Sequence, residues 1–383
     1  MRVLILGGRA PVALDHARRF SAAGWDVSIA DCGPCRISSW SRSVLKTMRL
    51  PPPRADLPAF ARALVDLVEE ERIDLVLPTC EEAFYVSAIR DRLAATCSVF
   101  VAPFDAMRAL HSKFQFLVLA RSCGVEVPES ALVTNLSDAR DWANGRPVVL
   151  KPEYSRFGVF VRLYPQGIPA MGRPLPVAGP WVVQSFQRGR ELCSYSTAVA
   201  GRVTAHVTYE PTYRLQGSSS YYFEPRAVPA VEAAVGRIVE RLGYTGQISF
   251  DWVERMGGGV VPLECNPRAI SGVHLFDRTD PLPEAMLGRV ADTLRPRLST
   301  PAMLAPVMLA AGLPRAIHRG DLHRWRLDWG RARDVLAVPG DIAPAIGAAA
   351  DIAAFMALAL RHRCSLRTAS TRDLEWDGEA LVP

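Results

Sequence analysis

The stretch Val260-Val261-Pro262-Leu263-Glu264-Cys265-Asn266-Pro267-Arg268 decides how this chain is interpreted. It follows three consecutive glycines, and the segment before those glycines is largely apolar and contains Asp251. Two such runs on either side of a glycine turn predict a β-hairpin. If Gly257-Gly258 form a two-residue turn, Asp251 lies directly opposite Glu264, with Cβ atoms about 4.5–5.5 Å apart.

This pairing predicts a metal site on one face of the hairpin. Glu264 and Asn266 are two positions apart, so they share a strand face and bring an amide oxygen to the two carboxylates. Hard oxygen ligands of this kind suit Mg²⁺ that also takes phosphate oxygens. Opposed acids repel, so a cation or basic group is expected between them. Arg268 adds a positive charge that could hold a phosphate oxygen. The alternative is a pair of solvated acids near a turn.

Outward from the hairpin, the start of the chain reads as a parallel α/β unit. Val3 to Leu6 is an apolar run that ends in two glycines, a helical pattern follows, and a second apolar run spans Val27 to Ala30. The cycle repeats up to about residue 103, which we take as the end of an N-terminal domain. No GxGxxG motif follows the first strand, so the dinucleotide fingerprint is absent.

The middle of the chain, residues 104–300, predicts a different arrangement. Its helices are expected at 103–124 and 229–242, its short strands at 132–133, 147–152, 159–161, 181–184, 247–254 and 260–265, and a flexible Gly/Ser/Tyr-rich loop at 216–223. Short strands between Gly and Pro turns favour a small antiparallel subdomain. Residues 301–383, with an arginine-rich segment and an Ala-rich helix, are expected to form a C-terminal appendage.

Composition limits the classes of protein. The 383 residues are 49% hydrophobic and 22% charged, with a formal net charge of +6, which indicates a globular chain and does not demand nucleic acid. The first apolar run is too short for a secretory signal. We therefore expect a cytoplasmic protein with free thiols. The Ala-rich segment from Ile342 to Leu360 is expected to be a buried helix rather than a membrane span.

Two further segments carry motifs that we interpret as incidental. Cys32-Gly33-Pro34-Cys35 copies a redox CxxC but ends a strand of another kind of fold, so a redox role is disfavoured. Arg315 to Arg333 interleaves arginines with histidines and tryptophans, as some nucleic-acid-binding segments do. An exposed strand face or a dock for an acidic carrier is the preferred interpretation.

The lysines are a separate signal. Of the 45 basic residues only Lys46, Lys113 and Lys151 are lysines, and the others are arginines. A surface lysine can drift to arginine at little cost, but a compact ammonium group in a tight phosphate site is less interchangeable. Lys113 lies in the helical pattern of the middle region, and Lys151 ends the apolar run Val148-Val149-Leu150. The surviving lysines are therefore candidates for phosphate binding.

In this combination the chain resembles a known family. Leu263 to Arg268 is similar to the (L/V)ExNPR motif of the ATP-grasp superfamily, and Ser271-Gly272 follow as a small-residue loop does there. The resemblance covers about residues 1–300 in motif order. It implies a Rossmann-like N-terminal domain followed by the two-lobed ATP-grasp fold, with a small lobe at about 131–183 and a large lobe at about 184–300.

The resemblance also implies roles for individual residues. Lys113 and Lys151 would bind phosphates, Gln184, Ser185 and Phe186 would meet adenine, and Glu191 would take the ribose hydroxyls. Asp251, Glu264 and Asn266 would hold two Mg²⁺ ions, for which Mn²⁺ can substitute, and Arg268 would be the catalytic cation. The chain departs from the family in the phosphate-covering loop, which reads Glu153-Tyr154-Ser155-Arg156-Phe157-Gly158 and has one glycine. Arg156 would replace backbone contacts by charge there.

The implied activity is ATP-dependent ligation. A substrate carboxylate attacks the γ-phosphate to give an acyl phosphate and ADP, and an amine then displaces phosphate. The alternative is a nucleotide-binding interaction protein without catalysis. The expected partners are a small acid and a small amine, free or tethered to a carrier, with no nucleic acid and no membrane span. The oligomeric state stays open, with a homodimer as the candidate because dimers are common in that family.

Residues for the two substrates are harder to place from sequence. Glu81 and Glu82 follow a predicted strand at its carboxyl end, where they could hold an amine or cap a helix. Tyr221 lies in the expected loop, as a lid residue or as plain surface. Ser271 belongs to the small-residue loop after the motif. His274 follows closely and is more typical of a structural histidine.

Overall fold

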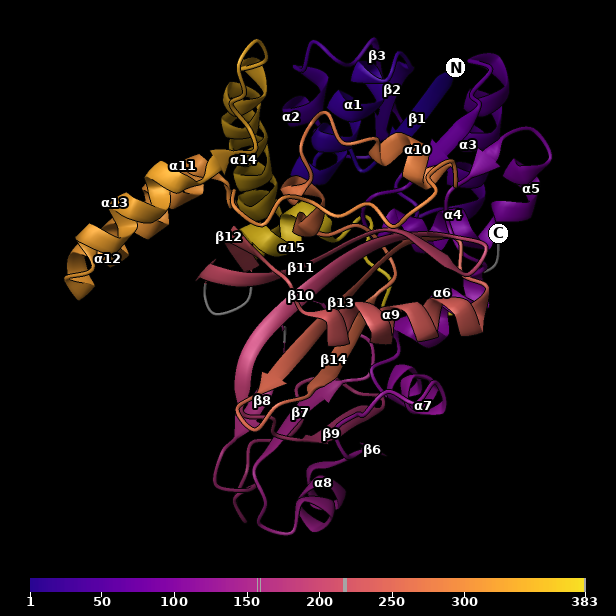
Figure 1. Cartoon of the computed structure of the whole chain (residues 1–383). Helices are drawn as coiled ribbons and strands as arrows, with labels where there is room; N and C mark the ends of the chain where they lie inside the picture. Colours follow the sequence, from indigo (N-terminus) through magenta and orange to yellow (C-terminus); the bar gives the residue numbers. More distant parts are fainter. Residues whose placement is uncertain (157, 159, 216–218, 382–383) are drawn as a thin grey trace.

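The computed structural model describes the whole chain except residues 157, 159, 216–218 and 382–383. It opens with a parallel sheet in the order β3-β2-β1-β4-β5, with helices packed around it (Figure 1). The elements are β1 (Arg2–Leu6), α1 (Pro11–Ala22), β2 (Asp26–Asp31), α2 (Arg36–Ser39), β3 (Lys46–Arg49), α3 (Leu57–Glu70), β4 (Leu75–Leu77), α4 (Glu82–Ala88), α5 (Arg90–Ala94) and β5 (Ser98–Val99). The predicted parallel α/β unit is confirmed, with α2 and β3 in addition.

Local sequence explains how this sheet presents its carboxyl edge. Gly7 follows β1 with φ +76°, and a Cβ there would lie 2.7 Å from the hydroxyl of Thr79, so glycine lets the two strand ends approach. The helix α3 begins after Asp56, whose carboxylate accepts the backbone N–H of Ala59 at 2.9 Å. Because Gly7 allows this close approach, the residues that follow β4 lie beside the end of β1. This is the edge where ligands bind in open α/β sheets.

Two helices, α6 (Phe104–His111) and α7 (Gln115–Ser122), replace the single helix expected at 103–124. The hydroxyl of Ser112 accepts the N–H of Gln115 at 3.0 Å and so starts α7 as a separate helix. The prediction that Lys113 lies inside a helix is wrong. It lies in the break, where its backbone N–H donates to the carbonyl of Glu153 at 3.1 Å.

The small lobe is an antiparallel sheet in the order β6-β9-β7-β8, with one helix against it (Figure 1). Its elements are β6 (Ser130–Val133), α8 (Leu136–Ala143), β7 (Val148–Pro152), β8 (Arg162–Tyr164) and β9 (Trp181–Ser185). Fully buried Trp181 anchors its core. The antiparallel subdomain is confirmed, although the strand expected at 159–161 begins at Arg162, and residue 159 lies outside the described residues.

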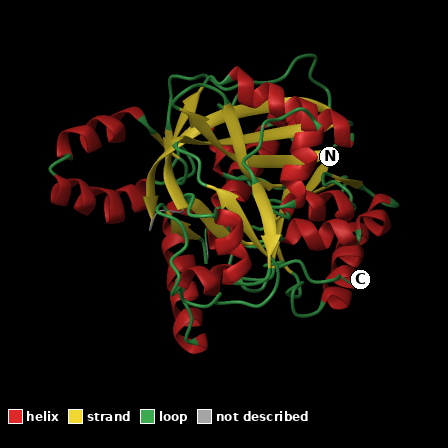
Figure 2. Cartoon of the chain, turned by 90° about the horizontal axis from the view of Figure 1, so that it is seen from below, coloured by secondary structure: helices red, strands yellow, loops and turns green. Residues whose placement is uncertain are grey.

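The large lobe is a seven-stranded sheet in the order β14-β13-β10-β11-β12-β15-β16, with α9 lying along it (Figures 1 and 2). Its elements are β10 (Gly189–Val199), β11 (Arg202–Leu215), β12 (Ser219–Arg226), α9 (Pro229–Leu242), β13 (Gly246–Arg255), β14 (Val260–Asn266), the 3-10 turn η1 (Ser271–Leu275), α10 (Leu282–Met286), β15 (Ala302–Met303) and β16 (Arg333–Asp334). The helix α9 begins at proline and ends before a left-handed Gly243, as expected.

The loop expected at 216–223 is wrong where the structure describes it. Residues 219–223 belong to β12, which pairs with β11, and residues 216–218 lie outside the described residues. Tyr221 and Tyr222 are 1% and 0% exposed because they pack under the C-terminal segment. Apolar contacts with residues that are distant in the sequence therefore outweigh the turn-like composition of this segment.

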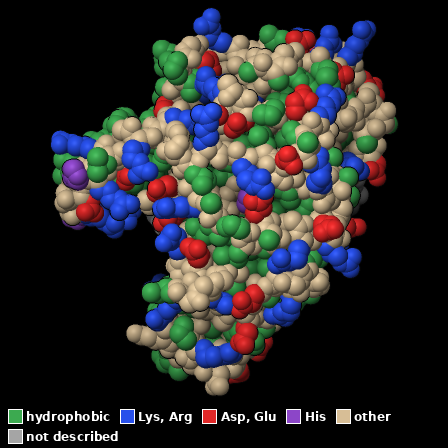
Figure 3. Space-filling view, in the orientation of Figure 1, with side chains coloured by type: hydrophobic (Ala, Val, Ile, Leu, Met, Phe, Trp, Pro, Cys, Tyr) green, Lys and Arg blue, Asp and Glu red, His purple; other side chains and the backbone are tan. Residues whose placement is uncertain are grey.

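The residues after 300 pack on both preceding regions. β15 pairs with β12, and β16 pairs with β15. Between them, α11 (Ala305–Val307), the π-helical turn η2 (Met308–Gly312), α12 (Leu313–Arg319) and α13 (Leu322–Arg331) form an arm that projects from the body. The space-filling view shows blue Lys and Arg side chains along it (Figure 3). The exposed strand face expected for 315–333 is therefore wrong.

The Ala-rich segment forms α14 (Ala343–His362), followed by α15 (Leu366–Thr371). By length and mean hydropathy, 1.8 over its most apolar window, α14 is the one helix of the described chain that could cross a membrane. One of its faces packs against α2, where Asp351 accepts the backbone N–H groups of Arg36 and Ile37. The helix was expected to be buried, and it is buried on that face only.

Gln247, 3% exposed, links the N-terminal domain to the large lobe from the start of β13. Its side-chain oxygen lies 2.9 Å from Nε2 of His16 and accepts a bond from the hydroxyl of Tyr195 at 2.8 Å. Its amide donates to the carbonyl of Pro78 at 2.9 Å, just beyond β4. One amide therefore serves three buried groups from three elements, and this fixes the sheet edge of the first domain against the second.

We expect Gln247→Leu to lower the free energy of unfolding by about 2–4 kcal/mol, because it leaves three buried polar groups without a hydrogen-bond partner. Urea unfolding followed by tryptophan fluorescence measures the change. Gln115→Leu, at an exposed position, is the matched control and should stay within about 0.5 kcal/mol of the parent. Equal stability of the two variants would contradict this account of the domain contact.

Candidate active site

Asp251 and Glu264 lie directly opposite each other on β13 and β14, as predicted. The hairpin reaches this register by another route, because its turn is longer than two residues and a β-bulge shifts the pairing between Asp251 and Trp252. Leu263 is the residue without a cross-strand partner, and its carbonyl accepts a hydrogen bond of 3.0 Å from Nζ of Lys151. The bulge therefore couples the acid pair to the small lobe. Asn266 lies on the same strand, opposite Ser249.

The two lysines singled out by composition converge on this pair. Lys113 and Lys151 are 3% and 5% exposed, whereas Lys46 is exposed and pairs with Glu71. Nζ of Lys113 lies 3.8 Å from Glu264 and donates to the carbonyl of Ser155 at 2.6 Å. Burial lowers the pKa of both buried lysines, that of Lys151 to about 8, although Glu264 opposes the shift.

The two acids occupy different electrostatic environments. Burial and the charge of Glu264 raise the pKa of Asp251, whose Oδ1 accepts a bond of 3.1 Å from the thiol of Cys193. Burial would also raise the pKa of Glu264, but Lys113 and Lys151 outweigh it and hold that pKa below its ordinary value. Asp251 therefore lacks a cationic partner as close as those of Glu264.

This donor set fits a nucleotide-bound magnesium better than a metal held by protein alone. Among the described residues, no three His, Cys, Asp or Glu side chains lie close enough together to hold a metal ion. Asp251, Glu264 and the amide oxygen of Asn266 offer hard oxygens on one hairpin face. Mg²⁺ typically binds through one or two carboxylates, with phosphate and water oxygens completing its shell.

Arg268 is held by an acid from the N-terminal domain. Its Nε donates to Glu81 at 3.0 Å, and the other oxygen of Glu81 accepts from Nη1 of Arg156 at 2.8 Å. Burial would raise the pKa of Glu81, but the two guanidinium groups lower it to about 2. The sequence suggested that Glu81 holds an amine, whereas here both of its oxygens are engaged by arginines. Glu81 therefore joins the two candidate cationic groups.

Glu82 has a local role. Its Oε1 accepts the backbone N–H groups of Thr79 and Cys80, each at 2.9 Å, and so shapes the turn between β4 and α4. Its Oε2 is buried without a hydrogen-bond partner. Burial raises the pKa of Glu82 to about 7. Neither glutamate caps α4 with its side chain, since the contact of Glu82 goes back to the turn before the helix.

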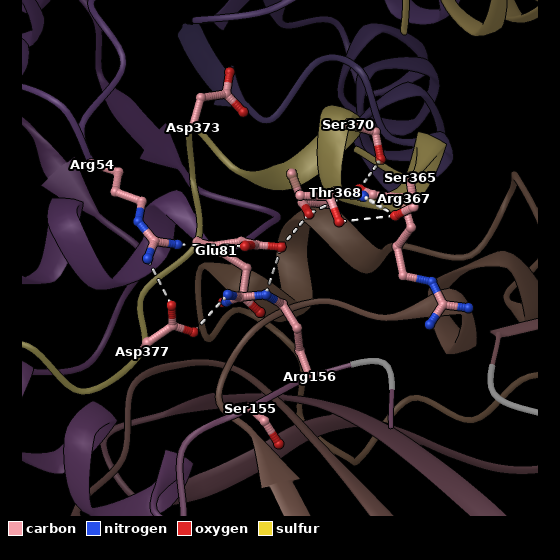
Figure 4. A network of polar contacts seen from close by, with 12 residues as sticks. Arg54, Glu81, Ser155, Arg156, Ser365, Arg367, Thr368, Ser370, Asp373 and Asp377 are labelled. Carbon is pink, nitrogen blue, oxygen red and sulfur yellow. Dashed lines mark hydrogen bonds and ion pairs between the residues drawn. The ribbon is translucent and has the colours of Figure 1, made fainter. Parts of the chain in front are cut away.

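The loop predicted to cover the phosphates is tied down at several points. The carboxylate of Glu153 accepts a bond from the hydroxyl of Ser112, and the carbonyl of Ser155 receives Lys113. Arg156 is 7% exposed and points away from this loop toward Glu81 (Figure 4). Residues 157 and 159 lie outside the described part of the chain. A cavity of about 390 Å³ lies against the loop, with Ser155, Phe160, Thr368 and Asp377 in its lining.

The predicted adenine and ribose residues lie where the small lobe passes into the large lobe. Gln184 is 2% exposed in β9, and its Oε1 lies 3.3 Å from Nζ of Lys151. Ser185 ends β9, and the backbone N–H of Phe186 donates to the carbonyl of Pro147. Glu191 is the last exposed residue at the start of β10, and it forms an ion pair with Arg214. These four residues line one connection between the lobes.

The remaining substrate candidates are not gathered at the site. Tyr221 is 1% exposed inside the core that β12 forms with the arm, so it is not presented to a ligand. His274 is 3% exposed, and its Nδ1 lies 2.8 Å from Asp15 of α1, which is a structural contact between domains. Ser271 opens η1, two residues beyond Ala269, and is partly exposed.

The CxxC thiols do not behave as a redox pair. Cys32 and Cys35 are both free, and burial raises the pKa of each thiol, that of Cys35 to about 12. A redox cysteine needs the opposite shift. Cys32 instead contacts Asp373 near the C-terminus at 3.1 Å. The incidental interpretation of this motif is supported.

Sequence reasoning missed the C-terminal contribution to this region. Glu375 and Asp377 form ion pairs with Arg156 at 3.0 and 2.8 Å, and Trp376 between them is fully buried. A tryptophan flanked by two acids was the signal available, but nothing local indicates what it docks against.

The geometry can now be compared with known proteins. The structure is similar to an L-amino acid ligase from Bacillus licheniformis, with a TM-score of 0.56, 15% identity and 77% of each chain covered. It is also similar to N5-carboxyaminoimidazole synthetase from Staphylococcus aureus in complex with ADP, with a TM-score of 0.63, 13% identity, and 83% of this chain and 86% of the other covered. The chain has the ATP-grasp fold.

Further likenesses agree with this fold. The biotin carboxylase domain of Hydrogenobacter thermophilus 2-oxoglutarate carboxylase, a dimer in complex with MgADP, matches with a TM-score of 0.59 and 14% identity over 78% of this chain and 73% of the other. In sequence, 270 residues are 25% identical to the carbamoyl phosphate synthase large chain of Gemmatimonas aurantiaca. That match covers 65% of this chain and spans about a quarter of the relative, 24% of its length. No family model matches the sequence.

We expect Asp251→Asn to raise the free energy of unfolding of the nucleotide-free protein by about 1 kcal/mol, because it removes a like charge opposite Glu264 in a partly buried setting. Urea unfolding without divalent metal measures the change. Asp105→Asn, at a side chain that is 90% exposed, controls for the loss of one acid and should be neutral. Destabilisation by Asp251→Asn would contradict the view that the pair is mutually repulsive.

Proposed function

We propose that the chain is an ATP-dependent ligase that activates a carboxylate as an acyl phosphate and joins it to an amine, releasing ADP and phosphate. The observation that supports this proposal is the convergence of opposed acids, two buried lysines and Arg268 where three regions of an ATP-grasp fold meet. Such a site offers charge compensation and positioning and needs no side-chain nucleophile.

In this proposal each charged group has a separate task. Asp251, Glu264 and Asn266 hold Mg²⁺, two ions in the fuller form of the proposal, with Mn²⁺ as a substitute. When bound, the metal neutralises phosphate oxygens. Lys113 and Lys151 bind the phosphates from the α7 side and the β7 side, and their buried ammonium groups are poorly hydrated and ready to exchange carbonyl partners for phosphate oxygens.

Arg268 is proposed to stabilise charge on the transferring phosphoryl group and the acyl oxygen. Its guanidinium is oriented by Glu81 and contacts the carbonyl of Ala269, so its direction is set before substrate arrives. Gln184, Ser185 and Phe186 are proposed to meet adenine largely through backbone atoms. Glu191 would bind the ribose after leaving Arg214, a change that an exposed ion pair allows at little cost.

The substrates are proposed as a small carboxylic acid and a small amine, free or carried by another protein. The cytoplasm and a homodimer are the proposed setting and assembly. The activities of the similar proteins, including ligation of amino acids, fall within the same reaction class but do not select one acid or amine for this chain.

Glu264→Gln should lower turnover by roughly 100-fold or more while leaving the fold intact, because it removes a metal ligand and the partner of Lys113. The measurement is ADP and phosphate release with mass detection of the product, over a panel of acids and amines. Glu254→Gln, on the same hairpin and more exposed, is the matched control and should keep near-parental rates. Circular dichroism and thermal unfolding confirm that both variants fold.

Two outcomes would decide against the proposal. Near-normal turnover in Glu264→Gln would remove the metal-binding pair from the mechanism. ATP binding by the parent protein, without ADP release on any acid of the panel, would favour a nucleotide-binding interaction protein instead.

A further inference from the structure

The C-terminal tail, residues 372–381, returns to the proposed active site (Figure 4). Trp376 is fully buried and stacks on Phe84 of α4 with ring centroids 4.8 Å apart. It meets Tyr154 of the phosphate-covering loop edge-on at 5.2 Å. The tail therefore fills the space between the N-terminal domain and this loop.

The acids on either side of Trp376 begin a chain of ion pairs with alternating sign. Glu375 and Asp377 pair with Arg156 at 3.0 and 2.8 Å, and Arg156 pairs with Glu81 at 2.8 Å. Glu81 then pairs with Arg268 at 3.0 Å. The chain of contacts thus runs without a break from the tail to the proposed catalytic arginine.

The charges in this chain balance. Arg54 pairs with both tail acids, at 3.4 and 2.7 Å, so three arginines face three carboxylates. The inner members are largely withdrawn from water, since the side chains of Arg156 and Glu81 are each 6% exposed. Removing one partner from such a network leaves a buried charge without compensation, which costs far more than losing an exposed pair. The tail acids are therefore needed to keep Arg156 in place.

All three nitrogen atoms of the Arg156 guanidinium group are engaged in these contacts. Its Nε, Nη1 and Nη2 each meet a different carboxylate, those of Glu375, Glu81 and Asp377. The sequence suggested that Arg156 replaces backbone contacts to phosphate by its charge. The observed geometry makes it an anchor of the loop instead. A loop with one glycine does not need wide backbone freedom if its conformation is held from outside.

We propose that the tail is an integral part of the active site, in which Glu375 and Asp377 are positioning residues that act through Arg156 and Glu81 on Arg268. This inference rests on the proposed function for its catalytic consequence. Its structural part, the fixing of the loop by the tail acids, stands independently of any reaction. The cavity of about 390 Å³ supports it, because tail and loop residues line the same space.

The structural part is tested by trypsin, which cuts after arginine. In the parent protein Arg156 is 7% exposed and paired, so cleavage after it should be slow. Glu375→Gln/Asp377→Asn preserves side-chain shape and removes both charges. We expect the rate of the cut between residues 156 and 157, followed by mass spectrometry on the folded protein, to rise at least tenfold.

A charge-preserving exchange separates ion pairing from packing. Glu375→Asp/Asp377→Glu alters side-chain shape but keeps both charges. Trypsin should cut this variant after Arg156 no more than about threefold faster than it cuts the parent protein. If the tail acted by packing alone, this exchange would expose the site more than the isosteric neutral variant does. Glu69→Gln/Glu70→Gln, on the exposed end of α3, controls for the loss of two acids and should match the parent.

If the neutral double variant fails to fold by circular dichroism, Asp377→Asn alone is the second test. The side chain of Asp377 is 44% exposed, so this change is tolerated more easily. It should raise the rate of cleavage after Arg156 about threefold. Parental cleavage rates in the folded neutral variants would overturn the proposal.

The catalytic consequence is measured with the substrate pair found by ADP release. In the neutral double variant kcat should fall at least tenfold, and the charge-preserving exchange should restore most of it. Faster cleavage with unchanged kcat would overturn the link to Arg268 while leaving the ligase assignment intact. Faster cleavage in a protein that never releases ADP would overturn the proposed function and keep the loop anchoring.

Discussion

The structure depends on one constraint, that two acids lie opposite each other on a partly buried ribbon. Asp251 and Glu264 cannot both be charged there without compensation. The chain supplies it asymmetrically, because Lys113 and Lys151 hold the pKa of Glu264 low, whereas Asp251 accepts a hydrogen bond from the thiol of Cys193 and its pKa is raised. The three regions that meet here do so around this charge balance.

The same constraint recurs on the other side of the site. Glu81 is buried at the edge of the first sheet and is stable as an anion because Arg268 and Arg156 both bind it. Arg156 in turn needs the acids of the tail. Each buried charge in this series of ion pairs therefore needs a partner of opposite sign. The series ends at Arg54 and Asp377, whose side chains are partly exposed to solvent. Alternating charge thus connects the end of the chain to the domain that the first residues build.

Much of the site could be predicted from the sequence because its spacing is local. A two-residue glycine turn predicts the pairing of Asp251 with Glu264, although the structure reaches it through a longer turn and a bulge. Lys113 and Lys151 stand out against an arginine-rich background. The bulge at Leu263 could not be predicted, since it costs one ladder position and is stabilised by Lys151 from another lobe. The ion pairs of Arg156 could not be predicted for a similar reason, as its partner Asp377 lies 221 residues away. Buried β12 and one-sided α14 depend likewise on contacts across the fold.

The loop at residues 153–158 shows how such distant contacts can replace a local rule. A phosphate-covering loop rich in glycine is mobile, so binding must supply the order that it lacks. This loop is held before binding by Ser112 at Glu153, by Lys113 at Ser155 and by three carboxylates at Arg156. Less conformational entropy then remains to be lost when ligand arrives, and the requirement for glycine is relaxed. The cost is transferred to the tail, whose buried charges must all be paired for the loop to stay in place.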